Sequence, residues 1–63
     1  MTLEETIIAI GKDFGYIGQF PLETPKWKAF AANPSGTFAR GSTPLEAVKN
    51  LYEKLQEIKN KVQ

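Results

Sequence analysis

The chain contains no cysteine among its 63 residues, so neither a disulfide nor a thiolate-bound metal can hold it folded. A domain of this length folds alone but stays only marginally stable. Hydrophobic residues form 41% and charged residues 24% of the chain, which is typical of a globular rather than a disordered sequence. We therefore expect residues 1–63 to form one small domain around a single apolar core.

Side chains that commonly catalyse reactions are scarce in this sequence. Histidine, the commonest general base and metal ligand, is absent. The adjacent carboxylates of Glu4 and Glu5 would not face each other on a helix, and they suit the first turn of a helix instead. The glycines near Ser35 and Ser42 lack the spacing of a phosphate-binding loop. We expect a protein that is not an enzyme and that needs no cofactor.

Charge and hydropathy narrow the range of partners and locations. Eight Lys and Arg residues against seven Asp and Glu residues give a net charge of +1, which does not by itself require a polyanionic partner. The longest apolar run covers only residues 7–10, whereas a membrane span needs about 20 residues. Glu4 and Glu5 give the first residues the wrong sign for a signal peptide. We expect no membrane contact and a cytoplasmic location.

The first helix is predicted by a capping box formed by Thr2 and Glu5. Apolar residues then follow at helical spacing, and Gly15 is a suitable stop. We therefore expect a helix over residues 3–14. Residues 16–22 are ambiguous, because their aromatic and branched side chains favour a strand whereas a glycine and a proline among them do not. They fit either a short edge strand or an extended connection.

A β-hairpin is predicted by two segments around a dense turn signal. Residues 26–32 alternate with period two, and the turn residues 33–36 combine Asn, Pro, Ser and Gly. Residues 37–42 then form the returning strand. The alternation places one side of each strand on the core and the other side outside. We expect the core side to hold Trp27, Ala29, Ala31 and Phe38, and the outer side to hold Phe30, Ala32 and Ala39.

A second helix is predicted over residues 44–61. Thr43 and Glu46 form another capping box, and Pro44 stands at the first helical position, where its missing N–H costs nothing. A long apolar stripe follows. The whole order is α-β-β-(β)-α. It predicts an α+β fold of two layers, with an antiparallel sheet of two or three strands and the helices on one face.

Phe30 is the residue that most directly suggests a binding surface. An apolar strip on the outer side of a sheet usually marks a site for a partner. The alternative is a single exposed ring, or a ring covered by residues 16–22. Our leading hypothesis is a protein partner held by surface complementarity, as for an inhibitor or an antitoxin, and a phage protein would fit the same description. The expected partner-binding residues are Lys28, Phe30, Arg40 and Tyr52.

Two other hypotheses remain open. Basic residues with aromatic neighbours can bind nucleic acid by neutralising phosphates and stacking on bases. The alternative explanation of the same residues is a purely structural one, in which lysines at a strand edge prevent pairing with another chain. Separately, the second helix has a long apolar stripe for so small a domain, which suggests a homodimer. The candidate nucleic-acid contacts are Lys26, Lys28, Arg40 and Lys49.

A resemblance to a known family rests on three short segments. They are Trp27-Lys28-Ala29-Phe30, then Ser35-Gly36, and then Gly41-Ser42-Thr43-Pro44-Leu45-Glu46-Ala47-Val48 followed by Leu51. This pattern of a hairpin and then Gly-x-Thr-x-x-Glu-Ala resembles antitoxin domains of the HicB type over residues 27–55. The resemblance implies a small non-enzymatic α+β domain that dimerises and binds a small toxin protein. The helix at the start of this chain departs from that family, which usually begins with a strand, and no extra DNA-binding segment is expected.

The order helix, three strands, helix also resembles the double-stranded-RNA-binding domain. Gly36, Gly41 and Ala47 stand roughly where the third strand and second helix of that family meet. That resemblance implies RNA binding through a lysine cluster at the start of the second helix. Here residues 43–46 contain an acid in place of the lysines, and the first lysine is Lys49. We therefore expect the fold to be shared rather than the RNA binding.

Overall fold

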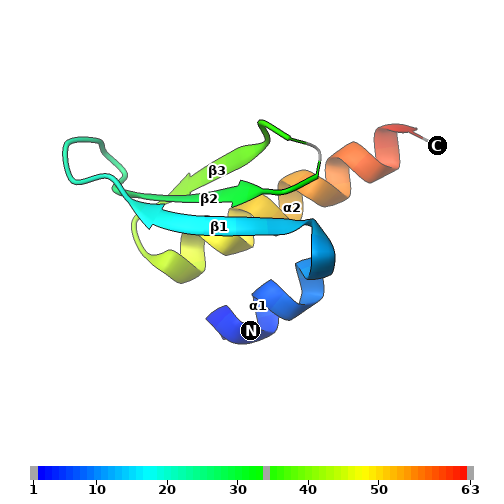
Figure 1. Ribbon diagram of the computed structural model, residues 1–63, viewed down its shortest axis with the longest axis horizontal. Coiled ribbons are helices and arrows are strands. Elements are labelled where there is room, and N and C mark those ends of the chain that lie inside the picture. Colours follow the sequence, from blue (N-terminus) through cyan, green and yellow to red (C-terminus); the bar gives the residue numbers. More distant parts are fainter. Residues whose placement is uncertain (1, 34, 63) are drawn as a thin grey trace.

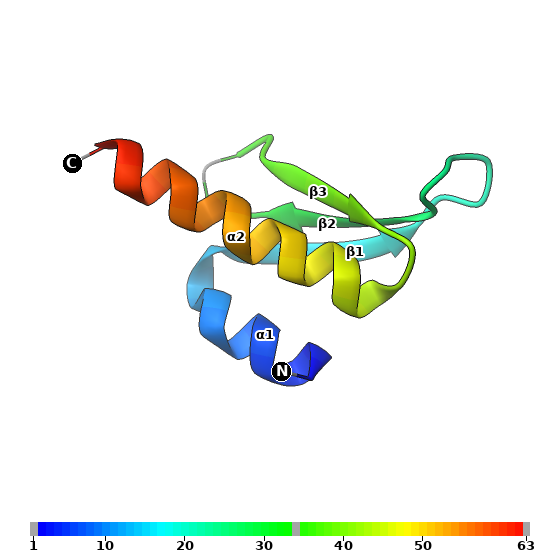
Figure 2. The same ribbon diagram turned by 180° about the vertical axis from the view of Figure 1, so that it is seen from behind.

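The structure, a computed structural model, describes residues 2–33 and 35–62, with side chains as far as residue 61. Its three strands form an antiparallel sheet in the order β1-β2-β3. Figures 1 and 2 show the sheet as one layer and both helices as the other. The predicted α+β fold of two layers is therefore confirmed. The elements are α1 Leu3–Ile10, a 3₁₀ turn Gly11–Asp13, β1 Phe14–Gln19, β2 Trp27–Ala31, β3 Phe38–Gly41 and α2 Pro44–Val62.

The first helix begins as predicted but ends early. The hydroxyl of Thr2 accepts a hydrogen bond from the backbone N–H of Glu5, and the Glu5 carboxylate accepts one from the backbone N–H of Thr2. The helix ends at Ile10 rather than at residue 14, because Gly11 takes up a φ of 72° and caps it. The chain holds two glycines that can end a helix here, and the prediction that Gly15 ends it is wrong.

The ambiguous segment after this helix is an edge strand, one of the two alternatives left open. It begins at Phe14 and ends at Gln19, so it starts and stops earlier than residues 16–22. A β-bulge lies between Phe14 and Tyr16, which is where the chain turns from the helical layer into the sheet. The predicted hairpin follows. Its turn includes Pro34, which lies outside the described residues, while Gly36 has a φ of 88° that favours glycine.

The core lies between the sheet and α2. Ala47, Val48 and Leu51 of α2 are fully buried, and they share one cluster with the fully buried Ala29 of β2. α1 packs beside α2 on the same side of the sheet. The core members also include the buried residues Ile10, Ala31 and Leu55.

β3 approaches the start of α2 so closely that only glycine fits at Gly41. A Cβ atom there would lie 2.4 Å from the backbone nitrogen of Ala47. Gly41 therefore faces α2. Because successive side chains of a strand point to opposite sides of the sheet, Ala39 faces the core and Phe38 faces away from it. We had expected Phe38 in the core and Ala39 outside, and the structure reverses both. The pairing of Phe38 with Phe30 places these two rings on the same outer side.

Gly41→Ala is expected to lower the free energy of unfolding by about 1–3 kcal/mol, the usual cost of forcing an extra group into a packed site. The clashing atoms belong to the backbone of α2 and cannot rotate away. Urea denaturation followed by circular dichroism measures the change. Gly18→Ala is the matched control, because its Cβ would meet only the ring of Phe20, at 3.4 Å. Equal stability of the two variants would contradict the close approach.

Candidate binding face

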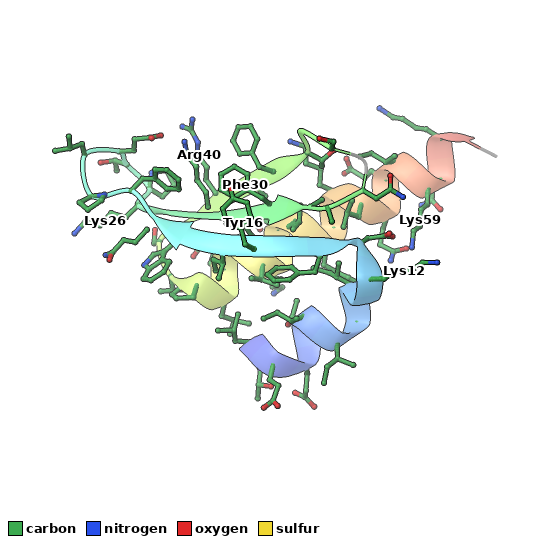
Figure 3. The ribbon with its side chains drawn as sticks, in the orientation of Figure 1. Lys12, Tyr16, Lys26, Phe30, Arg40 and Lys59 are labelled. Atoms are coloured by element: carbon green, nitrogen blue, oxygen red, sulfur yellow. The ribbon has the colours of Figure 1, made fainter. Side chains whose placement is uncertain are left out.

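The side of the sheet turned away from the helices, here called the outer face, carries a group of four aromatic rings. We define this aromatic cluster as Tyr16, Phe20, Phe30 and Phe38. Pairing across the strands sets Tyr16 opposite Phe30 and Phe30 opposite Phe38. Figure 3 shows Phe30 and Arg40 projecting on the side opposite to α1 and α2. The cluster draws on all three strands and on the connection that follows β1.

Two rings of the aromatic cluster stack on each other. The ring centroids of Tyr16 and Phe30 lie 4.5 Å apart with an angle of 15° between the planes. This separation is close to the spacing of about 4.8 Å between neighbouring strands, so the two rings stack on each other side by side. Each of the two rings therefore covers one face of the other. Tyr16, at the sheet edge, remains 59% exposed.

Cations surround the aromatic cluster. Lys28 and Arg40 are direct partners across β2 and β3. The Lys28 ammonium lies 4.6 Å from the ring centroid of Phe20, and the Arg40 guanidinium lies 5.8 Å from that of Phe38. Lys54 reaches over from α2 to within 5.5 Å of the same Phe38 ring. Such cation–π contacts hold the charged groups against the rings and leave a mixed aromatic and basic surface.

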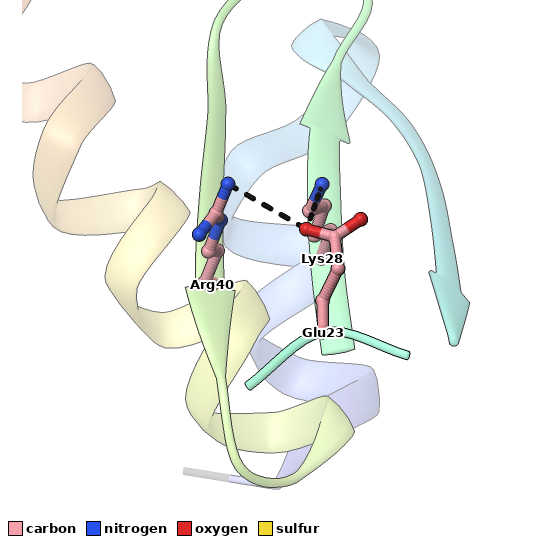
Figure 4. Close-up of polar contacts among 3 residues, drawn as sticks. All are labelled: Glu23, Lys28 and Arg40. Atoms are coloured by element: carbon pink, nitrogen blue, oxygen red, sulfur yellow. Dashed lines mark ion pairs between the residues drawn. The ribbon is translucent and has the colours of Figure 1, made fainter. Parts of the chain in front are cut away.

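Glu23 lies over the two cations at the end of the outer face. One of its oxygens, Oε1, is 2.7 Å from the Lys28 ammonium and 3.6 Å from the Arg40 guanidinium, as Figure 4 shows. The hydrogen bond from Lys28 lowers the pKa of the Glu23 carboxyl, and the two positive charges lower it further. Sequence reasoning missed Glu23. The only available signal was a single acid in the connection between two strands that carry outward basic residues.

The expected partner-binding residues separate into two groups. Lys28, Phe30 and Arg40 come together on the outer face. Tyr52 does not join them, because it lies on α2 and packs half-buried against the core.

The candidate nucleic-acid contacts are also divided. Lys26 is exposed just before β2, whereas Lys49 is exposed on α2 in the helical layer. Trp27 packs against the core, as expected, so Phe30 is the aromatic of β2 that accompanies the basic residues on the outer face.

The two edges of the sheet differ. Along β3, the side chain of Asn50 donates to the carbonyl of Arg40 and the ammonium of Lys54 donates to the carbonyl of Phe38, each at 2.9 Å. These bonds close that edge to a further strand. Along β1, the pairing with β2 directs the backbone of Ile17 and Gln19 outward. No hydrogen bond among the described residues involves these outward backbone N–H and C=O groups. β1 is therefore the open edge of the sheet, and it lies beside the aromatic cluster.

Other features of the described residues are less informative. A shallow hollow of about 240 Å³ is lined by Thr24, Pro25, Lys26 and Ser42, and it is smaller than most small-molecule sites. No group of three acidic side chains in the described part of the chain could hold a metal ion. None of its helices is long and apolar enough to cross a membrane.

Comparison with protein-family models, with curated proteins and with solved structures gives no match for this chain. The last of the three segments that carry the resemblance to HicB-type domains, which starts at Gly41, has structural roles here. Gly41 permits the contact with the backbone of Ala47, and Thr43 accepts a hydrogen bond from the backbone N–H of Glu46. The Glu46 carboxylate accepts one from the backbone N–H of Ser42. These residues join β3 to α2 and do not belong to the outer face.

A pH titration tests the contact between Glu23 and Lys28. We expect the pKa of Glu23 to lie below the ordinary glutamate value. Lys28→Met should move it upward, because the hydrogen bond that favours the charged form is lost. Carboxyl ¹³C NMR gives both midpoints. The stabilisation from this ion pair is present above the ordinary pKa and disappears as the pH falls through the lowered one. An unchanged midpoint in the variant would contradict the geometry.

Proposed function

We propose that this protein is a non-enzymatic cytoplasmic module that binds a partner protein through its outer face, in the manner of an inhibitor or an antitoxin. The observation that carries the proposal is the aromatic cluster, which spans three strands on a face that neither helix covers. Contiguous apolar patches with a polar rim usually mark protein interaction sites. Here Lys28 and Arg40 supply the rim, and aromatic and arginine side chains are enriched where binding energy concentrates.

The orientation of the rings favours a protein over a nucleic acid. Bases bind by stacking on ring faces, and the contact between Tyr16 and Phe30 already takes up one face of each of these rings. The basic residues also favour a protein, because Glu23 already pairs with Lys28 and Arg40, while Lys49 lies in the other layer. The net charge of +1 adds little attraction for phosphates.

The resemblance to HicB-type antitoxin domains agrees with a protein partner but does not locate the contact. Its residues at the junction of β3 and α2 support the fold. A phage or mobile-element inhibitor would use an outer face of this kind equally well. The class proposed is therefore a small binding protein that acts by occupying a surface of its target.

Loss of exposed aromatic surface is expected to weaken partner capture. Tyr16→Ala and Phe30→Ala should each reduce the affinity by about 5- to 100-fold if these rings anchor the partner. The measurement is capture from a lysate of the source organism with tagged protein, followed by an affinity measurement on the captured protein. Ile8→Ala is the matched control, because Ile8 is 71% exposed but lies on α1, away from the outer face.

Two readouts separate this proposal from nucleic-acid binding. A captured protein in fixed ratio should survive nuclease treatment and moderate salt, whereas a phosphate-dependent complex should weaken steeply with salt. Folding of each variant is checked by circular dichroism. Unchanged capture by folded Tyr16→Ala and Phe30→Ala proteins would remove the outer face from the site. Nucleic acid that is lost on nuclease treatment would favour the alternative.

The open edge of β1 favours a second use, self-association of two copies. Its backbone groups at Ile17 and Gln19 point outward, and a second β1 strand offers the same groups in antiparallel pairing. The strand contains no charged residue that would oppose such pairing. A homodimer of this kind would leave both aromatic clusters on one continuous outer face.

Sedimentation velocity tests the homodimer. We expect a dimer at about 100 μM, because a domain of this size gains stability from association. Gln19→Pro should shift the protein to monomer, since it removes an outward N–H without touching the pairing with β2. A wild-type protein that is monomeric at this concentration would contradict self-association through β1.

A further inference from the structure

We propose that Lys28 and Arg40 form a carboxylate-binding site on the outer face, and that Glu23 of the chain itself fills this site until an Asp or Glu side chain of the partner replaces it. The inference names the chemistry of the partner, so in that respect it rests on the proposed function. It also assigns Glu23 a role as an internal stand-in for the ligand.

The first step is the environment of Lys28. Its side chain is only 13% exposed, and its ammonium lies between the rings of Phe20 and Phe38, at 4.6 and 5.6 Å from their centroids. A lysine side chain enclosed to this extent is stabilised by an anion beside its ammonium. Among the described residues, Glu23 is the acid within ion-pair distance of it. The site therefore favours a carboxylate, in the free protein and in any complex that covers it.

The second step is that Glu23 contacts Lys28 more closely than it contacts Arg40. Both cations share the single oxygen Oε1 of Glu23, and the distance to Arg40 is 3.6 Å against 2.7 Å for Lys28. A guanidinium can hold a carboxylate with two parallel hydrogen bonds, and Glu23 makes no such bidentate contact. Arg40 is still 46% exposed and keeps donors for another group. A carboxylate that arrives from the solvent side can therefore bind Arg40 better than Glu23 does.

The third step is the position of Glu23 in the chain. It lies in the connection between β1 and β2, outside every helix and strand. Its backbone N–H donates to the carbonyl of Phe20, and its side chain is 38% exposed. The side chain can leave without breaking any pairing of the sheet. Replacing one carboxylate by another keeps the charge of the site balanced, so the exchange discriminates against partners that bring no acid to this point.

The site adjoins the aromatic cluster, which predicts a partner segment with an acidic and an apolar side chain close together. The simplest probe with both features is 3-phenylpropionate, and its neutral counterpart is 3-phenylpropanamide. Each is titrated into ¹⁵N-labelled wild-type protein and into Glu23→Gln. The signals followed are the Arg40 Nε–H and the backbone amides of Lys28 and Phe30.

Glu23→Gln is expected to bind 3-phenylpropionate about tenfold more tightly than the wild type. This is the factor produced when the internal carboxylate fills the site roughly nine-tenths of the time. The amide should bind both proteins equally weakly. Arg40→Gln combined with Glu23→Gln should abolish the gain. The same spectra report whether the fold is preserved. Glu53→Gln is the matched control, because Glu53 is an exposed acid on α2.

Equal affinity of wild type and Glu23→Gln for 3-phenylpropionate would overturn the inference, as would an equal gain for the amide. Inorganic phosphate that binds Glu23→Gln more tightly than the carboxylate probe would overturn the assignment to carboxylates. These titrations need no partner, so their failure is distinguishable from failure of the proposed function. If Tyr16→Ala lost capture of the partner while Glu23→Gln left the affinity for 3-phenylpropionate unchanged, the outer face would remain the binding site. The role of Glu23 as an internal substitute for the ligand would then be rejected.

Discussion

The close approach of β3 to α2 determines what both sides of the sheet carry. Gly41 lies against the backbone of Ala47, where a Cβ would be 2.4 Å from the nitrogen. This contact fixes which side of β3 faces the helix. Alternation then turns Phe38 and Arg40 outward, next to Phe30 of β2. The composition of the outer face is thus a consequence of how the inner face packs.

Local signals in the sequence predicted where both helices begin, whereas the orientation of β3 depends on a contact between distant segments. The capping boxes and Gly36 act within a few residues, so they could be recognised directly. Period two fits either orientation of β3, and only the contact with α2 distinguishes Phe38 from Ala39. Lys28, Phe30 and Arg40 follow from alternation once the register is known. Tyr52, the fourth expected contact, packs in the helical layer.

Glu23 was beyond sequence reasoning because its role depends on a connection that folds back over the sheet. Alternation places Lys28 on the outer face but does not show that its ammonium is enclosed by rings. Enclosure is what makes an anion favourable there. Glu23 balances this charge in the free protein. The exposed ring of Tyr16 is apolar surface in contact with water, and a complementary surface that covers it would remove that contact.

Photo-crosslinking tests the central claim most directly, because it reports what touches the outer face in the cell. A benzophenone side chain is placed at Tyr16 and, in a separate protein, at Ile8 on α1. The account predicts one discrete protein adduct from position 16, which forms in nuclease-treated samples as well, and none of that mass from position 8. An adduct from position 8 alone, or an adduct with nucleic acid at position 16, would contradict the account.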